Sequence, residues 1–205
     1  MKNIITLNES DIARIVKRVI SENQKVLLKE SKDVVNKGIL TGKYKEYNNL
    51  GSAGVFDRVF KKERELGLAP IANWTNGCAT KVSLALAAAG QKVDAAYITT
   101  SGPEKGTPIQ TSAMGLKNNL TKLWGEPDVK VKGSITEEEL QKKVGQGNTG
   151  VMICAPCGFD GASGHATVWS KYFGTDKKGG PLDETFYHLN NPGAEISIWR
   201  VGGNS

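Results

Sequence analysis

The apolar residues of this 205-residue chain change their period part-way along it, and this change constrains the fold class most strongly. Residues 78–89 are mostly Ala, Leu, Val and small polar residues, a composition typical of a buried helix, and Gly90 is placed to end it. A second helix is predicted at 113–124, where Leu116, Leu120 and Leu123 share one side. Ser134 and Glu137 form a candidate capping box before a short helix through Val144.

Beyond that point the helical period disappears and short apolar runs bounded by Gly, Pro and Asn take its place. Runs of this length and setting are typical of strands in an antiparallel sheet. The predicted strands are residues 150–154, 165–169, 186–189 and 196–201. The sequence therefore predicts an α+β fold in which a buried helix packs on an antiparallel sheet.

The first 36 residues are predicted to form a separate element. Asn8 or Ser10 can cap a helix whose apolar face is Ile12, Ile15, Val16, Val19 and Ile20, and residues 29–37 are predicted to be a linker. Two interpretations remain open. The helix packs on the main domain, residues 37–205, or it is a detachable docking or export segment.

The formal net charge of +6 favours anionic partners, but Lys and Arg are dispersed and form no dense block. A basic solvated surface explains this pattern without nucleic acid, and an anionic wall polymer is compatible with it. The apolar stretch 4–7 is too short for a signal peptide, and no run approaches the roughly 18 apolar residues of a membrane span. The sequence thus predicts synthesis in the cytoplasm, no stable membrane insertion and, for an extracellular target, export by another route.

Cys78 and His165 are the strongest catalytic candidates in a chain with only two His and three Cys. Cys78 opens the predicted buried helix, where the partial positive charge and free N–H groups favour a thiolate and can hold an oxyanion. His165 opens a predicted strand after the Gly-rich segment 158–164, a suitable place for a general base. The plainer alternatives are an inert buried cysteine and a structural histidine.

A third group is expected to orient the imidazole. Asp176 is the preferred candidate, because the chain can turn back beside the His165 strand; the weaker candidates are Asp160, Asp183 and His188. Asn76 and Trp74 precede Cys78 and are candidates for lining a substrate cleft, although core packing explains Trp74 equally well.

Cys154 and Cys157 allow three interpretations. With Cys78 and His165 they make a Cys3His zinc set, but the gaps between these residues are much longer than in usual zinc sites. A thioredoxin-like redox pair requires a helix start, whereas a strand precedes this pair. A structural disulfide or two free thiols is the favoured interpretation.

Several segments together resemble the fourth family of type VI secretion amidase effectors. In its catalytic-helix motif an Asn precedes a Cys-Ala pair, followed by a basic residue, an apolar residue and a Ser. Asn76, Cys78, Ala79, Lys81, Val82 and Ser83 match this motif, with Lys81 where the family usually has Arg. The other matching segments are Gly164-His165 with its strand to Trp169, residues 120–128, residues 48–60 and the final strand around Trp199.

The resemblance implies a papain-like, NlpC-type fold that hydrolyses the γ-D-glutamyl–meso-diaminopimelate bond of peptidoglycan stem peptides. It also implies a Cys-His-Asp triad without metal or organic cofactor, in which Cys78 and His165 match directly and spacing favours Asp176. A cognate immunity protein and a contractile secretion or injection apparatus are the implied partners, with action in the target cell periplasm. The alternatives are a phage or housekeeping wall endopeptidase and a non-catalytic, zinc-stabilised binding module.

Overall fold

A computed structural model describes residues 9–157, 164–171, 179–183 and 191–202, without the side chains of residues 9 and 24–30. The helices in this part of the chain are α1 (Glu9–Asp33), α2 (Lys37–Asn49), α3 (Gly51–Val59), α4 (Lys61–Glu65), a 3₁₀ turn (Ile71–Asn73), α5 (Cys78–Ala88), α6 (Ala113–Trp124) and α7 (Glu137–Val144). The strands are β1 (Tyr97–Ile98), β2 (Pro108–Ile109), β3 (Val129–Lys132), β4 (Gly150–Cys154), β5 (His165–Ser170), β6 (Gly180–Pro181) and β7 (Glu195–Arg200).

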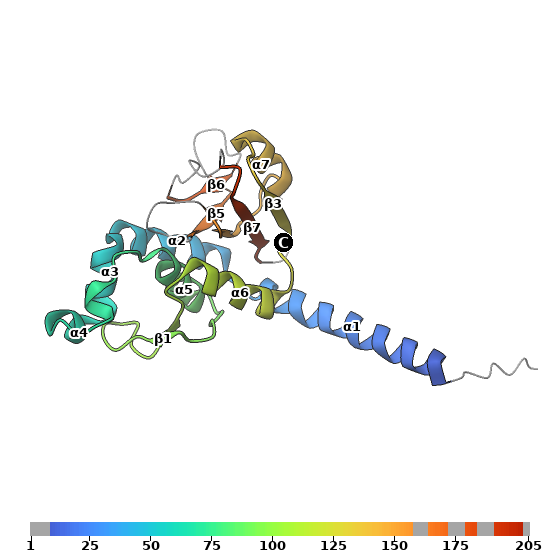
Figure 1. Cartoon of the computed structure of the whole chain (residues 1–205), viewed down its shortest axis with the longest axis horizontal. Coiled ribbons are helices and arrows are strands. Elements are labelled where there is room, and N and C mark those ends of the chain that lie inside the picture. The colour runs from blue at the N-terminus through green and yellow to red at the C-terminus, as the bar shows by residue number, and fades with distance from the viewer. Residues whose placement is uncertain (1–8, 158–163, 172–178, 184–190, 203–205) are drawn as a thin grey trace, which may run out of the picture.

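The main sheet is antiparallel, with strand order β3-β7-β4-β5-β6. Its central strand, β4, is buried along its whole length, as expected for a short run of Gly, Val, Met, Ile and Cys. The strands β1 and β2 form a separate two-stranded pair. The mixture of helices with an antiparallel sheet confirms the predicted α+β class (Figure 1).

Side chains alternate between the two faces of the sheet and build a core on each side. On one face, Val151 and Ile153 of β4 and Val168 of β5 join the larger core, to which α2, α3, α5 and α6 also contribute. On the other face, Met152 and Trp169 join residues of β3, β7 and α7. The helix α5 is therefore enclosed between the sheet and the other helices, which explains its nearly uniform apolar composition.

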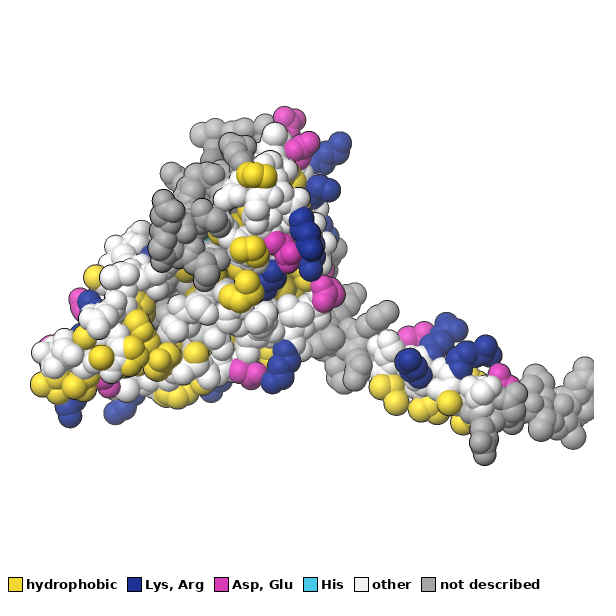
Figure 2. Space-filling model, viewed as in Figure 1, with side chains coloured by type: hydrophobic (Ala, Val, Ile, Leu, Met, Phe, Trp, Pro, Cys, Tyr) yellow, Lys and Arg dark blue, Asp and Glu magenta, His cyan; other side chains and the backbone are white. Residues whose placement is uncertain are grey.

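The helix α1 extends away from the rest of the molecule (Figure 1). Its last turn is attached to the main body, because Ser31 donates a hydrogen bond to the Leu123 carbonyl at 3.3 Å and Lys32 pairs with Asp128 at 3.1 Å. Further out, the predicted apolar face is exposed, and Figure 2 shows it opposite a row of basic side chains. Among the described residues, no helix has the length and apolar character needed to cross a membrane.

The structure confirms the helices predicted at 78–89 and 113–124 and the strands at 150–154, 165–169 and 196–201 to within about a residue.

Two predictions are wrong. The helix α1 continues to Asp33, into the predicted linker, and the capping box is formed by Thr136 and Glu139 instead of Ser134 and Glu137. Thr136 fits because its extended backbone directs the hydroxyl at the Glu139 N–H. The strand predicted at 186–189 lies outside the described residues.

Candidate active site

Cys78 is the first residue of α5 and only 7% exposed. Gly77 caps the helix, and its N–H donates a hydrogen bond to Ser52 Oγ at 3.0 Å. A Cβ atom at Gly77 would lie 3.2 Å from Ser52 Cα, so a larger residue would push α3 away from the start of α5. This close contact between the two helix ends holds the Cys78 thiol at a defined position.

The two candidate cleft residues before Cys78 lie in different surroundings. Asn76 is exposed, and its Oδ1 accepts a hydrogen bond from the Cys78 N–H at 3.2 Å. Trp74 is half-buried and stacks edge-to-face on Tyr97, with ring centroids 4.6 Å apart, and also contacts Phe56 and Phe60. Packing against other aromatic rings therefore accounts for the position of Trp74, whereas Asn76 hydrogen-bonds directly to the backbone of Cys78.

His165 is the first residue of β5 and pairs in register with Cys154 at the end of β4. The preceding Gly164 is packed closely, because a Cβ atom there would lie 2.5 Å from the Cys154 carbonyl oxygen. Cys154 and Cys157 form a disulfide. Two of the four ligands in the zinc interpretation are thereby joined to each other, and the structural-disulfide interpretation is confirmed.

The carboxylate beside His165 is that of Asp183, which follows β6. Its Oδ2 lies 2.7 Å from His165 Nε2, and the two side chains are 10% and 16% exposed. Asp183 was one of the weaker candidates from sequence. The preferred candidate, Asp176, lies outside the described residues, as do Asp160 and His188.

The imidazole of His165 is strongly perturbed by its surroundings. Burial alone would lower its pKa, but hydrogen bonds to Asp183 and Cys78, together with the charges of both groups, raise the pKa to about 9. His165 is therefore mainly protonated at neutral pH. An imidazolium between a carboxylate and a thiol is the arrangement that cysteine hydrolases use to protonate a leaving amine.

Lys81 adds a buried positive charge near Cys78 and Asp183. In the sequence, Lys81 stood out only as part of the motif around Cys78. It lies three residues after Cys78, and its Nζ donates a hydrogen bond to Asn48 Oδ1 on α2 at 3.1 Å. Burial lowers the pKa of Lys81, while the negative charges of Asp183 and Cys78 oppose that shift. The ammonium group thus contributes to the electrostatic field around both.

A cysteine at the start of a buried helix and a histidine at the start of an adjoining antiparallel strand define the papain-like class of cysteine hydrolases. Within that class the chain belongs to the family described as type VI secretion system amidase effector protein 4 (Tae4), whose model matches residues 74–199. Its members are antibacterial amidases that act on peptidoglycan, and the chain is such an enzyme.

Solved structures of Tae4 proteins share the fold. The effector from Enterobacter cloacae is 18% identical, with a TM-score of 0.57 over 82% of this chain and 96% of that one. The Salmonella typhimurium effector, in complex with the immunity protein Tai4 from Enterobacter cloacae, is 17% identical, with a TM-score of 0.57 over 82% of this chain and 99% of that one. A comparison with curated protein sequences finds no significant match.

Proposed function

We propose that Cys78, His165 and Asp183 form the catalytic triad, and that the bond hydrolysed is the γ-D-glutamyl–meso-diaminopimelate amide of peptidoglycan stem peptides. The observation that carries this proposal is the 2.7 Å contact of His165 Nε2 with Asp183 in a ring that also hydrogen-bonds to Cys78. Because Nε2 is occupied by the carboxylate, Nδ1 is the ring atom available to the thiol. The bond itself is inferred from family membership.

The reaction follows from this geometry. The sulfur of Cys78 attacks the amide carbonyl carbon as a thiolate, and the carbonyl oxygen becomes an oxyanion at the positive end of α5. The C–N bond then breaks as protonated His165 gives its proton to the leaving amine. Neutral His165 next removes a proton from water, the resulting hydroxide attacks the thioester, and the thiolate leaves. Formation of the thioester and its hydrolysis together return the enzyme to its starting state without a cofactor.

Asn76 is proposed to contact the substrate and to influence the oxyanion site. Its side chain is exposed beside Cys78, and its Oδ1 occupies the Cys78 N–H that an oxyanion would use. Substrate binding would therefore have to displace the Asn76 amide from that N–H. For Trp74 we propose a supporting role in which its packing on Phe56, Phe60 and Tyr97 fixes the segment that leads to Cys78.

The periplasm of a target cell is the proposed place of action, because peptidoglycan lies there. A cognate immunity protein that covers the site around Cys78 is the proposed inhibitor, because a solved effector–immunity complex from Salmonella Typhimurium pairs Tae4 with Tai4. The outer part of α1 is the proposed docking or export segment, since its apolar face is exposed and lies outside the matched residues 74–199.

The test is digestion of purified diaminopimelate-type peptidoglycan with the wild-type protein and Cys78→Ala, followed by mass spectrometry of the fragments. Arg14→Ala serves as the control variant, because Arg14 lies on the exposed part of α1. Wild type and control should release stem peptides cut between D-glutamate and diaminopimelate, and Cys78→Ala should release none. Cleavage at another bond would refute the substrate assignment, and an active Cys78→Ala would refute the nucleophile.

A further inference from the structure

Tyr44 lies on α2, far in sequence from the proposed triad, yet its hydroxyl contacts Asp183 of that triad. The side chain is fully buried in the larger core. Its hydroxyl donates a hydrogen bond of 3.0 Å to Asp183 Oδ2, the same oxygen that lies 2.7 Å from His165 Nε2. One carboxylate oxygen thus binds both the phenol and the imidazole.

The location of Asp183 explains why such a bond matters. Asp183 lies in the turn after β6, a strand of only two residues, whose adjoining Leu182 N–H bonds to the Val168 carbonyl at 2.9 Å. Asp183 thus lies outside the paired residues of the sheet, so contacts of its side chain must fix the carboxylate. Tyr44, by contrast, is held by a thirteen-residue helix with a fully buried ring.

The phenol is suited to act as a permanent donor. Burial, together with the neighbouring Asp183 charge, raises the pKa of Tyr44 well above its ordinary value, so the hydroxyl keeps its proton throughout the working range. A hydrogen bond from a neutral donor to a buried carboxylate is among the stronger side-chain interactions in proteins.

The rest of α2 strengthens the argument. One turn after Tyr44, Asn48 accepts the hydrogen bond from Lys81, the buried cation near Cys78 and Asp183. Residues four apart lie on the same face of a helix. This face of α2 therefore contacts the site at two successive turns. Both residues precede the segment 74–199 that matches the family model.

We propose that Tyr44 is a positioning residue of the amidase, one that holds Asp183 Oδ2 in the orientation needed to orient His165. The inference rests on the proposed triad and extends it. Tyr44 does not touch the reacting atoms. Its removal should change the turnover of bound substrate and the protonation of His165 more than it changes substrate binding.

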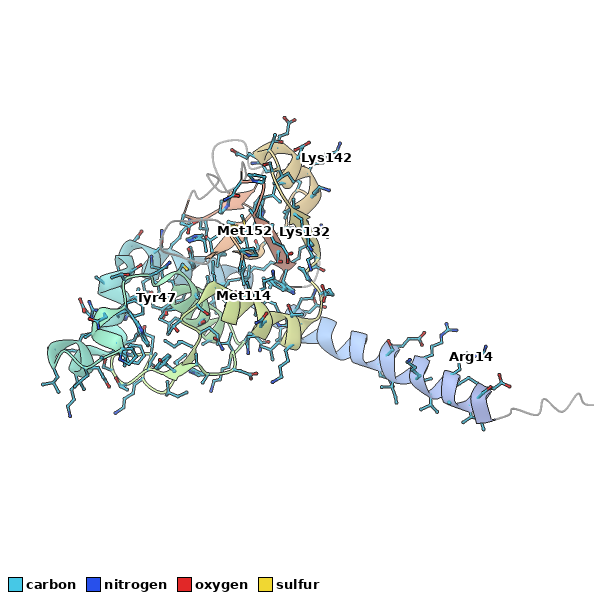
Figure 3. All side chains as sticks on the ribbon, viewed as in Figure 1. Arg14, Tyr47, Met114, Lys132, Lys142 and Met152 are labelled. Atoms are coloured by element: carbon cyan, nitrogen blue, oxygen red, sulfur yellow. A yellow bond between two sulfur atoms is a disulfide. The ribbon has the colours of Figure 1, made fainter. Side chains whose placement is uncertain are left out.

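The chain offers a matched control in Tyr47, three residues further along α2. Tyr47 is also buried, at 2% exposure, but its hydroxyl donates to Glu104 Oε1 at 3.1 Å. Figure 3 places Tyr47 among the helices on the α3 side of the molecule, apart from the sheet that carries Met152. Tyr44→Phe and Tyr47→Phe each remove one phenolic hydroxyl from a buried ring on α2. Only the hydroxyl of Tyr44 contacts the proposed triad.

The experiment measures kcat, KM and the pH profile of kcat/KM on a defined stem peptide for wild type, Tyr44→Phe, Tyr47→Phe, Asp183→Asn and Tyr44→Phe/Asp183→Asn. Tyr44→Phe should lower kcat about tenfold with KM within about twofold, as expected for losing a hydrogen bond to a charged group. The alkaline limb of the kcat/KM profile of Tyr44→Phe should move to lower pH, because the His165 imidazolium is paired with the Asp183 carboxylate for less of the time. Tyr47→Phe should match wild type.

The double variant tests whether Tyr44 acts through Asp183. In the Asp183→Asn background, Tyr44→Phe should cost less than twofold, since two residues acting on one group are not additive. A full tenfold cost there, an alkaline limb that stays or rises, or equal losses in both single Phe variants would overturn the inference. Failure of the triad itself gives a different result, namely an Asp183→Asn enzyme as active as wild type.

Discussion

The Nε2 atom of His165 lies 2.7 Å from Oδ2 of Asp183, although the two residues are 18 positions apart in the sequence. This contact determines which ring nitrogen is left for Cys78. It also joins β5, which carries the histidine, to the turn after β6.

Asp183→Asn should lower kcat/KM by about 100-fold or more, because loss of the carboxylate removes both the orientation and the charge stabilisation of the imidazolium. Asp176→Asn is the matched comparison, since sequence alone favoured that residue. Steady-state kinetics on a stem peptide measures both. A large loss with Asp176→Asn and a small one with Asp183→Asn would assign the third position to Asp176.

The activity should have an alkaline limb near pH 9. His165 has a pKa raised to about 9, so it is protonated below that pH and loses the proton needed by the leaving amine above it. In Asp183→Asn the largest effect opposing burial is gone, so the limb should move to lower pH. Profiles of kcat/KM from pH 5 to 10 test this, and a limb at the same pH in both proteins would contradict it.

Two glycine substitutions should have opposite effects on stability. Gly164→Ala would place a Cβ atom 2.5 Å from the Cys154 carbonyl oxygen, and it should cost about 1–3 kcal/mol of unfolding free energy. Gly42→Ala lies in α2 with open space around the new atom and should add roughly 0.5–1 kcal/mol. Urea unfolding measures both. Equal stability of the two variants would show that the packing at Gly164 relaxes freely.

Truncation should separate the exposed and attached parts of α1. Removal of residues 1–23 should leave peptidoglycan digestion and stability unchanged, because the described side chains there are exposed or half-exposed. Removal of residues 1–36 deletes buried Val35 and Asn36, whose side chain caps α2, and should cost roughly 2–4 kcal/mol. Thermal unfolding of both proteins measures the difference. A 1–36 deletion as stable as wild type would place the domain boundary at residue 37.

The sequence by itself determined those features that depend on local pattern. The helix that starts at Cys78, the helix at 113–124 and the central strand at 150–154 each carry their own period and end signals, so they were predictable residue by residue. Cys78 and His165 were predicted as the catalytic pair because they occupy a helix start and a strand start in a chain with only two His and three Cys. The start of α7 was misjudged by about two residues, because Ser134 and Thr136 offer equivalent capping patterns.

Only the tertiary structure decided which groups meet around His165. Asp183 and Tyr44 lie 139 residues apart, and nothing in their local sequence distinguishes them from other surface carboxylates or core tyrosines. They meet because α2 packs beside α5 and β5 while β6 adds to the sheet edge next to β5. Such contacts depend on how whole elements dock, a long-range property that local propensity and spacing do not contain.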